Sequence, residues 1–167
     1  MSTYNWTSFT KRINISEPVQ TIYNAWATQR GLESWFLRSA LFTTPDGRQK
    51  SPEEDIDAND TYLWMWHGWP DSTNEKNRVL GANHKDMFQF YFAETCIVTV
   101  NISSFSETVS IVELTQSNIP EDEEHKIKYH LGCMEGWTFY LANLKSILEG
   151  GIDLRNKSLE IGGVINS

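Results

Sequence analysis

The first pattern along the chain alternates bulky with polar side chains from Trp6 to Ile15, and it predicts a first β-strand. The segment Ser16 to Pro18 then predicts a helix start, because Ser is a favoured N-cap and Pro suits the first helical positions. A break at Gln29 to Gly31 separates this helix from a second short one. Their apolar faces contain Val19, Ile22, Tyr23 and Trp26 in the first helix, and Leu32, Trp35 and Phe36 in the second.

From Leu37 to about Ser117 the pattern changes to short strands separated by turn residues, which is typical of a mostly antiparallel sheet. The clearest turns are expected at Thr43 to Gly47 and Asn83 to Asp86, and the last strand from Thr108 to Gln116. Alternation places one set of bulky side chains on a common face, which another element must cover. This set contains Tyr62, Trp64, Trp66, Phe88, Phe90, Phe92, Cys96, Val98, Val100 and Ile102.

The last long element has the strongest periodicity in the chain and predicts an amphipathic helix from about Lys126 to Glu149. At ~1.5 Å per residue this helix would be about 36 Å long, which is enough to cross the sheet. Gly150 and Gly151 follow at the place where a left-handed residue would end the helix. Its apolar face contains Leu131, Met134, Trp137, Leu141, Leu144 and Leu148.

These elements predict one α+β domain over residues 1–167, with a core from about residue 6 to residue 154. Two acidic stretches interrupt the apolar pattern. We interpret Ser51 to Asp60 as a solvated loop, because it contains too few apolar residues to be buried. Pro120 to His125 places negative charge where the start of the final helix favours it. The alternative interpretation of both stretches is an acidic ligand site.

The net charge narrows the classes of partner. Lys and Arg number 14 against 22 Asp and Glu, so the net charge is −8, and no basic cluster is longer than Lys11-Arg12. Nucleic acid and anionic membrane surfaces are therefore not expected as partners, because both are bound mainly through Lys and Arg. The sequence contains no apolar run long enough for a signal peptide or a membrane span, so a cytoplasmic location is expected.

Candidate chemistry is sparse. Cys96 and Cys133 form no CxxC pair, and the four His residues show no metal-ligand spacing, so neither a metal site nor a cofactor is expected. Glu113 and Glu135 are the carboxylates that could face inward, and such a carboxylate would need a partner or a raised pKa. His67 lies between Trp66 and Trp69, which would suit the mouth of a pocket. The sequence contains no catalytic motif that joins these residues.

Two segments resemble a known family. ISEPVQTIYNAWATQRGLESWF, from Ile15 to Phe36, resembles the opening signature of the START-like, or SRPBCC, superfamily. EGWTFYLANLKSILEGG, from Glu135 to Gly151, resembles the Gly-Trp helix that closes its activator-of-Hsp90-ATPase-homologue (AHSA1-like) branch. The resemblance covers about Phe9 to Leu154. It implies a helix-grip fold, in which an antiparallel sheet of about six or seven strands wraps around a long C-terminal helix, often with a cavity between them.

Members of this superfamily include lipid and hormone binders, a co-chaperone domain that stimulates the Hsp90 ATPase, and some cyclases, so the resemblance leaves function open. The 21 aromatic residues either fill the core or line a pocket. In the second case the protein binds a small hydrophobic or aromatic ligand without catalysis. The candidate cavity residues are Trp26, Trp35, Trp64, Trp66, His67, Phe88, Phe90, Glu113, Trp137, Tyr140, Leu141 and Leu144.

Two further functions remain open. The protein is a module that binds a chaperone or another protein partner, which the acidic surface and the resemblance favour. Alternatively it is an enzyme that uses Glu113, Glu135 or His67 on a ligand held in the cavity.

Overall fold

Seven antiparallel strands pair in one sheet in the order β1-β7-β6-β5-β4-β3-β2, in a computed structural model that describes residues 4–166. The strands are β1 (Phe9–Ile15), β2 (Ser39–Thr43), β3 (Thr61–Met65), β4 (Asn74–Ala82), β5 (Met87–Phe92), β6 (Cys96–Ser104) and β7 (Ser110–Ser117). The helices are α1 (Val19–Trp26), α2 (Gln29–Trp35), α3 (Glu123–His125), η1 (Lys126–Gly132) and α4 (Cys133–Leu148). Within residues 4–166, none of the helices has the length and apolarity that a membrane span requires.

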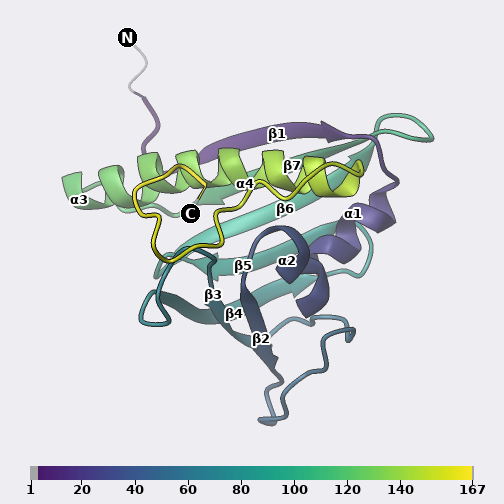
Figure 1. The fold of residues 1–167 in the computed structure, drawn as a ribbon, viewed down its shortest axis with the longest axis horizontal. Coiled ribbons are helices and arrows are strands. Elements are labelled where there is room, and N and C mark those ends of the chain that lie inside the picture. Colours follow the sequence, from purple (N-terminus) through teal and green to yellow (C-terminus); the bar gives the residue numbers. More distant parts are fainter. Residues whose placement is uncertain (1–3, 167) are drawn as a thin grey trace.

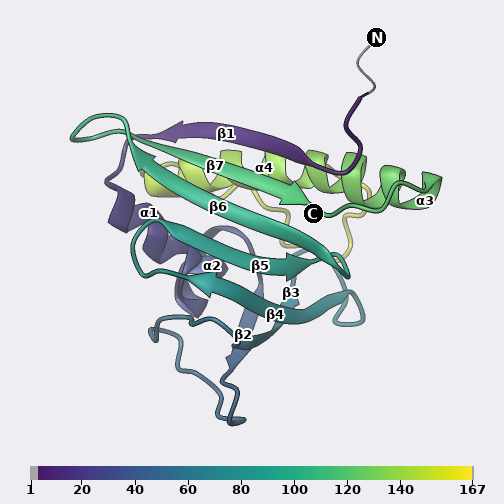
Figure 2. The same cartoon turned by 180° about the vertical axis from the view of Figure 1, so that it is seen from behind.

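The helices cover one face of the sheet and leave the other face bare. Figure 1 shows α4 lying across the sheet beside β1 and β7, with α1 and α2 next to it, and Figure 2 shows the strands from the uncovered side. The covered face is apolar because the strands alternate as predicted: in β5, Phe88 and Phe90 are fully buried while Gln89 points the other way. The predicted α+β architecture, with two short helices after the first strand and a long C-terminal helix, is confirmed.

The start of the helical segment differs from the prediction. Ser16 does not cap α1, whose N-cap is Pro18 without a side-chain hydrogen bond. The predicted break at Gln29 to Gly31 is wrong, because α2 begins at Gln29 and Thr28 caps it by accepting a hydrogen bond from the backbone N–H of Gly31. A Cβ at Gly31 would lie 2.2 Å from the backbone oxygen of Asn24. Glycine therefore lets α2 approach the end of α1 closely, and it does not end a helix there.

The C-terminal helix begins with a π-helical segment, which the sequence pattern missed. Helical backbone runs from Glu123 to Leu148, but η1 widens the turn between α3 and α4. The usual period of 3.6 residues does not hold there, so Tyr129 and His130 are buried and Leu131, predicted to be buried, is 43% exposed. His130 is held by the Tyr4 hydroxyl and by the backbone oxygen of Trp6, each at 2.9 Å. The predicted end of the helix is confirmed, since Gly150 has a φ of +76°.

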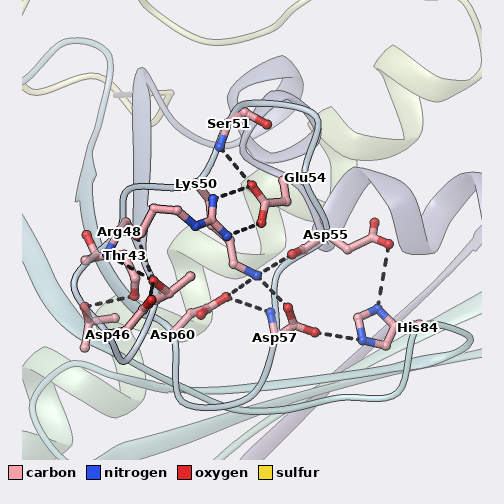
Figure 3. Close-up of polar contacts among 12 residues, drawn as sticks. Thr43, Asp46, Arg48, Lys50, Ser51, Glu54, Asp55, Asp57, Asp60 and His84 are labelled. Atoms are coloured by element: carbon pink, nitrogen blue, oxygen red, sulfur yellow. Dashed lines mark hydrogen bonds and ion pairs between the residues drawn. The ribbon is translucent and has the colours of Figure 1, made fainter.

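The acidic loop after β2 folds around one lysine (Figure 3). Nζ of Lys50 donates to the backbone oxygen of Asp55 and to Oδ2 of Asp57, both at 2.6 Å, and lies 2.7 Å from Oδ2 of Asp60. Asp60 and Ile56 are both 1% exposed. The prediction of a solvated loop is therefore wrong at Ile56 and Asp60, while most of the other residues of the stretch are exposed. Lys50 supplies the charge that lets Asp60 leave water.

The titration of these groups follows from the same contacts. Burial lowers the pKa of Lys50, but its hydrogen bonds to Asp57 and Asp60 outweigh burial and raise that pKa. The hydrogen bond from Lys50 lowers the pKa of Asp57, and His84 from the turn between β4 and β5 adds to this effect with Nε2 at 3.0 Å. These ion pairs hold the acidic loop against the sheet, and Lys50 supplies the central positive charge.

The segment after α4 runs back over the helices and is anchored to α2 (Figure 1). Arg155 is 8% exposed and donates to the backbone oxygens of Glu33, Ser34 and Leu37 at 3.0 to 3.1 Å. These are carbonyls at the C-terminal end of α2, where a cation is favourable. Burial would raise the pKa of Asp153, but hydrogen bonds from Arg155 and Lys157 outweigh it and hold that pKa well below the ordinary range.

Candidate functional site

A half-open pocket of about 190 Å³ lies between the start of α4 and the ends of β3 and β5. Its walls are mainly aromatic and come from five parts of the chain: the residue after α2, the residue after β3, the last residue of β5, η1, and α4. The rings are Phe36, Trp66, Phe92, Trp137 and Tyr140.

The rings contact one another at angles that leave a gap between them. Phe36 lies edge-on to Tyr140, with ring centroids 4.8 Å apart, and 5.1 Å from Trp137. Phe92 lies 5.3 Å from Trp137, and Trp66 lies 6.0 Å from Phe36 and 6.4 Å from Phe92. Three of these five pairs are edge-to-face and the other two are tilted. Edge-to-face contacts are a preferred arrangement of aromatic pairs, so the rings stabilise the pocket wall by packing on one another.

Two glycines open the pocket on the helix side. Gly132 and Gly136 both border it, four residues apart and one helical turn from each other. A Cβ at Gly136 would meet no other atom within 4 Å apart from its own helix, so the absent side chain leaves unfilled space.

The polar groups that border the pocket are few and mostly uncharged. Burial raises the pKa of the Cys133 thiol to about 11 and that of the Tyr140 hydroxyl to about 12. The indole N–H of Trp137 donates to Oε1 of Gln116 at 2.9 Å, which fixes this ring from behind. Lys128 supplies the single charged side chain among the bordering residues, and it lies over the ring of Tyr129, 5.2 Å from its centroid.

The predicted cavity residues divide into three groups. Trp66, Trp137 and Tyr140 border the pocket. His67 and Glu113 do not. The remaining seven fill the core at 0 to 3% exposure; they are Trp26, Trp35, Trp64, Phe88, Phe90, Leu141 and Leu144.

The core rings pack directly against one another. Trp26 and Trp35 are 4.6 Å apart in an edge-on contact, and Trp64 stacks on Tyr62 at 3.9 Å. Most of the aromatic side chains therefore fill the space between sheet and helix, and the open volume is confined to one end of it.

The two titratable candidates lie elsewhere. The expectation that Glu113 faces inward is wrong, because β7 turns Val112 and Leu114 to the core and Glu113 to the bare face, where its Oε2 lies 3.2 Å from Nε of Arg12. His67 is half-buried beyond the end of β3, and burial lowers its pKa. Glu135, the other proposed carboxylate, is exposed on α4.

Glu75 on β4 is an inward-facing carboxylate that the sequence pattern did not single out. Burial raises the pKa of Glu75, and its Oε1 accepts a hydrogen bond from the backbone N–H of Ala93 at 3.1 Å. This contact supports the turn after Phe92, where both Ala93 and Glu94 have positive φ angles. The sequence contains an indication of this orientation, since Glu75 alternates in phase with Asn77 and the buried Val79.

Comparisons with known proteins bear on the fold. No protein-family model and no curated protein matches the chain. Among solved structures, a protein from Staphylococcus saprophyticus superposes with a TM-score of 0.67 at 17% identity, covering 89% of this chain and 96% of the other. The Aha1 dimer from Colwellia psychrerythraea gives 0.65 at 19% identity, with coverages of 86% and 97%. A conserved protein of unknown function from Enterococcus faecalis gives 0.64 at 16%, with coverages of 84% and 70%.

These superpositions cover 86 to 89% of this chain with TM-scores of 0.65 to 0.67, which shows a shared fold. The chain has a helix-grip fold. At these identities the similarity is one of fold, and fold alone does not select a ligand or an activity. In this fold the pocket lies at the N-terminal end of α4.

Proposed function

We propose that this protein binds a small aromatic molecule, without catalysis, in the pocket between α4 and the sheet. The observation that carries the proposal is the wall of five rings around about 190 Å³ of open space. Flat aromatic ligands gain edge and stacking contacts on such walls in addition to burial of apolar surface.

The volume limits the size of the ligand. A dry apolar cavity of about 150 Å³ accepts benzene, whereas sites for drug-sized molecules measure about 300 to 1,000 Å³. A pocket of about 190 Å³ therefore suits a molecule of one or two fused rings. A sterol or a phospholipid would require the core rings to move apart, and those rings are closely packed.

The chemistry of the wall favours binding over catalysis. With a pKa raised to about 11, the Cys133 thiol stays protonated at neutral pH and is a poor nucleophile. Tyr140, with a pKa raised to about 12, is likewise uncharged and acts as a hydrogen-bond partner at most. The enzyme hypothesis based on Glu113, Glu135 or His67 has no support from this pocket, since none of the three borders it.

The proposal extends to the family branch. We infer that this domain belongs to the AHSA1-like branch, which the Gly-Trp motif at Gly136 and Trp137 supports. In this structure both residues border the pocket, so the motif that carries the resemblance also shapes the site.

The test is a titration of the protein with indole and with naphthalene, in which binding is measured by isothermal titration calorimetry and by the shift of the thermal midpoint. The variant Gly136→Leu extends a side chain into the open space and is expected to weaken binding at least tenfold. Ala142→Leu adds a larger side chain on the exposed side of the same helix and serves as the matched control, with unchanged affinity. Absence of saturable binding to the parent protein, or equal loss in both variants, would contradict the proposal.

A further inference from the structure

A second open groove lies over β2, β3 and β4. These strands form part of the bare face of the sheet that Figure 2 shows. The groove measures about 530 Å³, and it lies on the opposite face from the aromatic pocket. Two rows of paired residues cross its floor in register: Leu41, Leu63 and Lys76 form one row, and Thr43, Thr61 and Arg78 form the next.

The two cations of this groove belong to the five Lys and Arg residues of the protein that form no ion pair within residues 4–166. Of the 14 Lys and Arg residues, all within residues 4–166, nine form ion pairs with carboxylates. Lys76 and Arg78 are exposed and are not among the nine. No Asp or Glu borders the groove, although the chain carries 22 such residues. In a protein of net charge −8, this groove therefore carries two free positive charges side by side.

The spacing of the cations indicates the shape of an anionic occupant. Lys76 and Arg78 are alternate residues of one strand, so their side chains leave the same face about 7 Å apart. Carboxylates at alternate positions of an extended peptide have the same repeat. A phosphate or a single carboxylate would need donors that converge on one point, and these two side chains project in parallel.

Two further contacts favour an extended chain. Arg78 lies over the ring of Tyr91, 5.8 Å from its centroid, which limits the positions of its guanidinium group. Leu41 and Leu63, both half-buried, form an apolar strip beside the cations that can contact the aliphatic parts of a peptide.

We propose that this groove binds an acidic segment of a partner protein in extended conformation, with carboxylates at alternate positions paired to Lys76 and Arg78. Two cations are too few for a nucleic acid or an anionic membrane, since the affinity of both depends on many basic contacts. The site is independent of the aromatic pocket, so the two proposals stand or fail separately.

The experiment measures fluorescence anisotropy of a short fluorescein-labelled peptide with Glu at alternate positions, against the same peptide with Gln in place of Glu. The double variant Lys76→Gln/Arg78→Gln is expected to weaken binding of the Glu peptide about tenfold, because the contributions of two exposed ion pairs to the affinity are lost together. The matched control is Lys11→Gln/Lys85→Gln, which removes the same charge from two other cations that form no ion pair among the described residues. Thermal melting of all three proteins checks that they are folded.

The outcomes are distinct. Saturable binding of the Glu peptide that the groove variant weakens and the control variant retains supports the proposal. Equal weakening in both variants means attraction to net charge alone and overturns it, as does equal binding of the Gln peptide. Tighter binding of inorganic phosphate, of a single-stranded oligonucleotide or of vesicles containing phosphatidylserine would also overturn it, because it would assign the groove to another class of ligand.

Discussion

Two glycine-to-alanine substitutions, one in α2 and one in α4, test whether helix packing or helix propensity controls the stability of the protein at each site. Gly31 lies in the first turn of α2, and Gly136 lies inside α4 on the pocket wall. In a helix interior, alanine is favoured over glycine by about 1 kcal/mol. The substitutions have the same chemistry, so a difference between them reports the surroundings of the added Cβ.

The structure gives opposite signs for the two sites. At Gly136 the new Cβ meets no atom within 4 Å outside its own helix, so Gly136→Ala is expected to stabilise the protein by about 1 kcal/mol. At Gly31 the Cβ would lie 2.2 Å from the backbone oxygen of Asn24 and 2.8 Å from the Thr28 oxygen that caps α2. Overpacking costs about 1 to 3 kcal/mol and a weakened cap about 1 kcal/mol, so Gly31→Ala is expected to destabilise by about 1 to 3 kcal/mol.

Urea denaturation followed by tryptophan fluorescence measures both effects, and the slope of each transition shows whether the unfolded state has changed. For a chain of this length, 1 kcal/mol corresponds to about 2–4 °C in thermal midpoint, so calorimetry provides a second reading. Equal shifts of both variants would refute the argument, because propensity alone would then account for them. Destabilisation by Gly136→Ala would show that the helix side of the pocket is already filled.

Three further changes test the polar contacts. Lys50→Met leaves Asp60 buried without its cation and is expected to destabilise the protein by about 3–5 kcal/mol in urea denaturation; a loss below about 1 kcal/mol would mean that the loop opens to water. Arg155→Met removes the cation from the C-terminal carbonyls of α2, and a loss of about 3 kcal/mol is expected, with proteolysis of the segment after α4 as a second measurement. Burial raises the pKa of Glu75, so its stabilising effect is fully present below the ordinary value of 4.5 and is lost as the pH rises through the folded-state pKa. Glu75→Gln is therefore expected to raise stability at neutral pH and to leave it unchanged below pH 4.5, and a gain of equal size at both pH values would exclude titration as the cause.

Periodicity predicted the helices and strands of this fold well, because each element repeats one spacing of apolar residues along its length. The alternation around Phe88 and Phe90 identified the covered face, and the spacing of Trp137, Leu141 and Leu144 identified the buried face of α4. Features that depend on residues far apart in the sequence could not be predicted from periodicity. Arg155 donates to backbone oxygens of residues 118 to 122 positions away, which no local pattern reveals. The π-helical turns of η1 shift the helical phase without a residue type that marks them.

The candidate site was harder to predict for a related reason. Trp64 and Trp66 are two residues apart in the predicted strand and therefore share a face, so the sequence pattern does not distinguish them. In the structure β3 ends at Met65: Trp64 is fully buried under Phe36, whereas Trp66 lies past the last paired residue and borders the pocket. Whether a tryptophan of this segment fills the core or borders the pocket therefore depends on the residue at which strand pairing ends.

The size of the pocket follows from the same aromatic side chains that suggested a cavity. A sheet wrapped around a helix encloses a fixed space, and each large ring that packs inside it reduces the volume left for a ligand. Trp26, Trp35 and Trp64 occupy the middle of that space in mutual contact with other rings. The aromatic pocket lies at the end of the sheet, where Gly132 and Gly136 supply no side chain. Aromatic richness in a helix-grip protein therefore indicates a smaller ligand, and replacing Trp64 by a smaller residue should enlarge the range of molecules that bind.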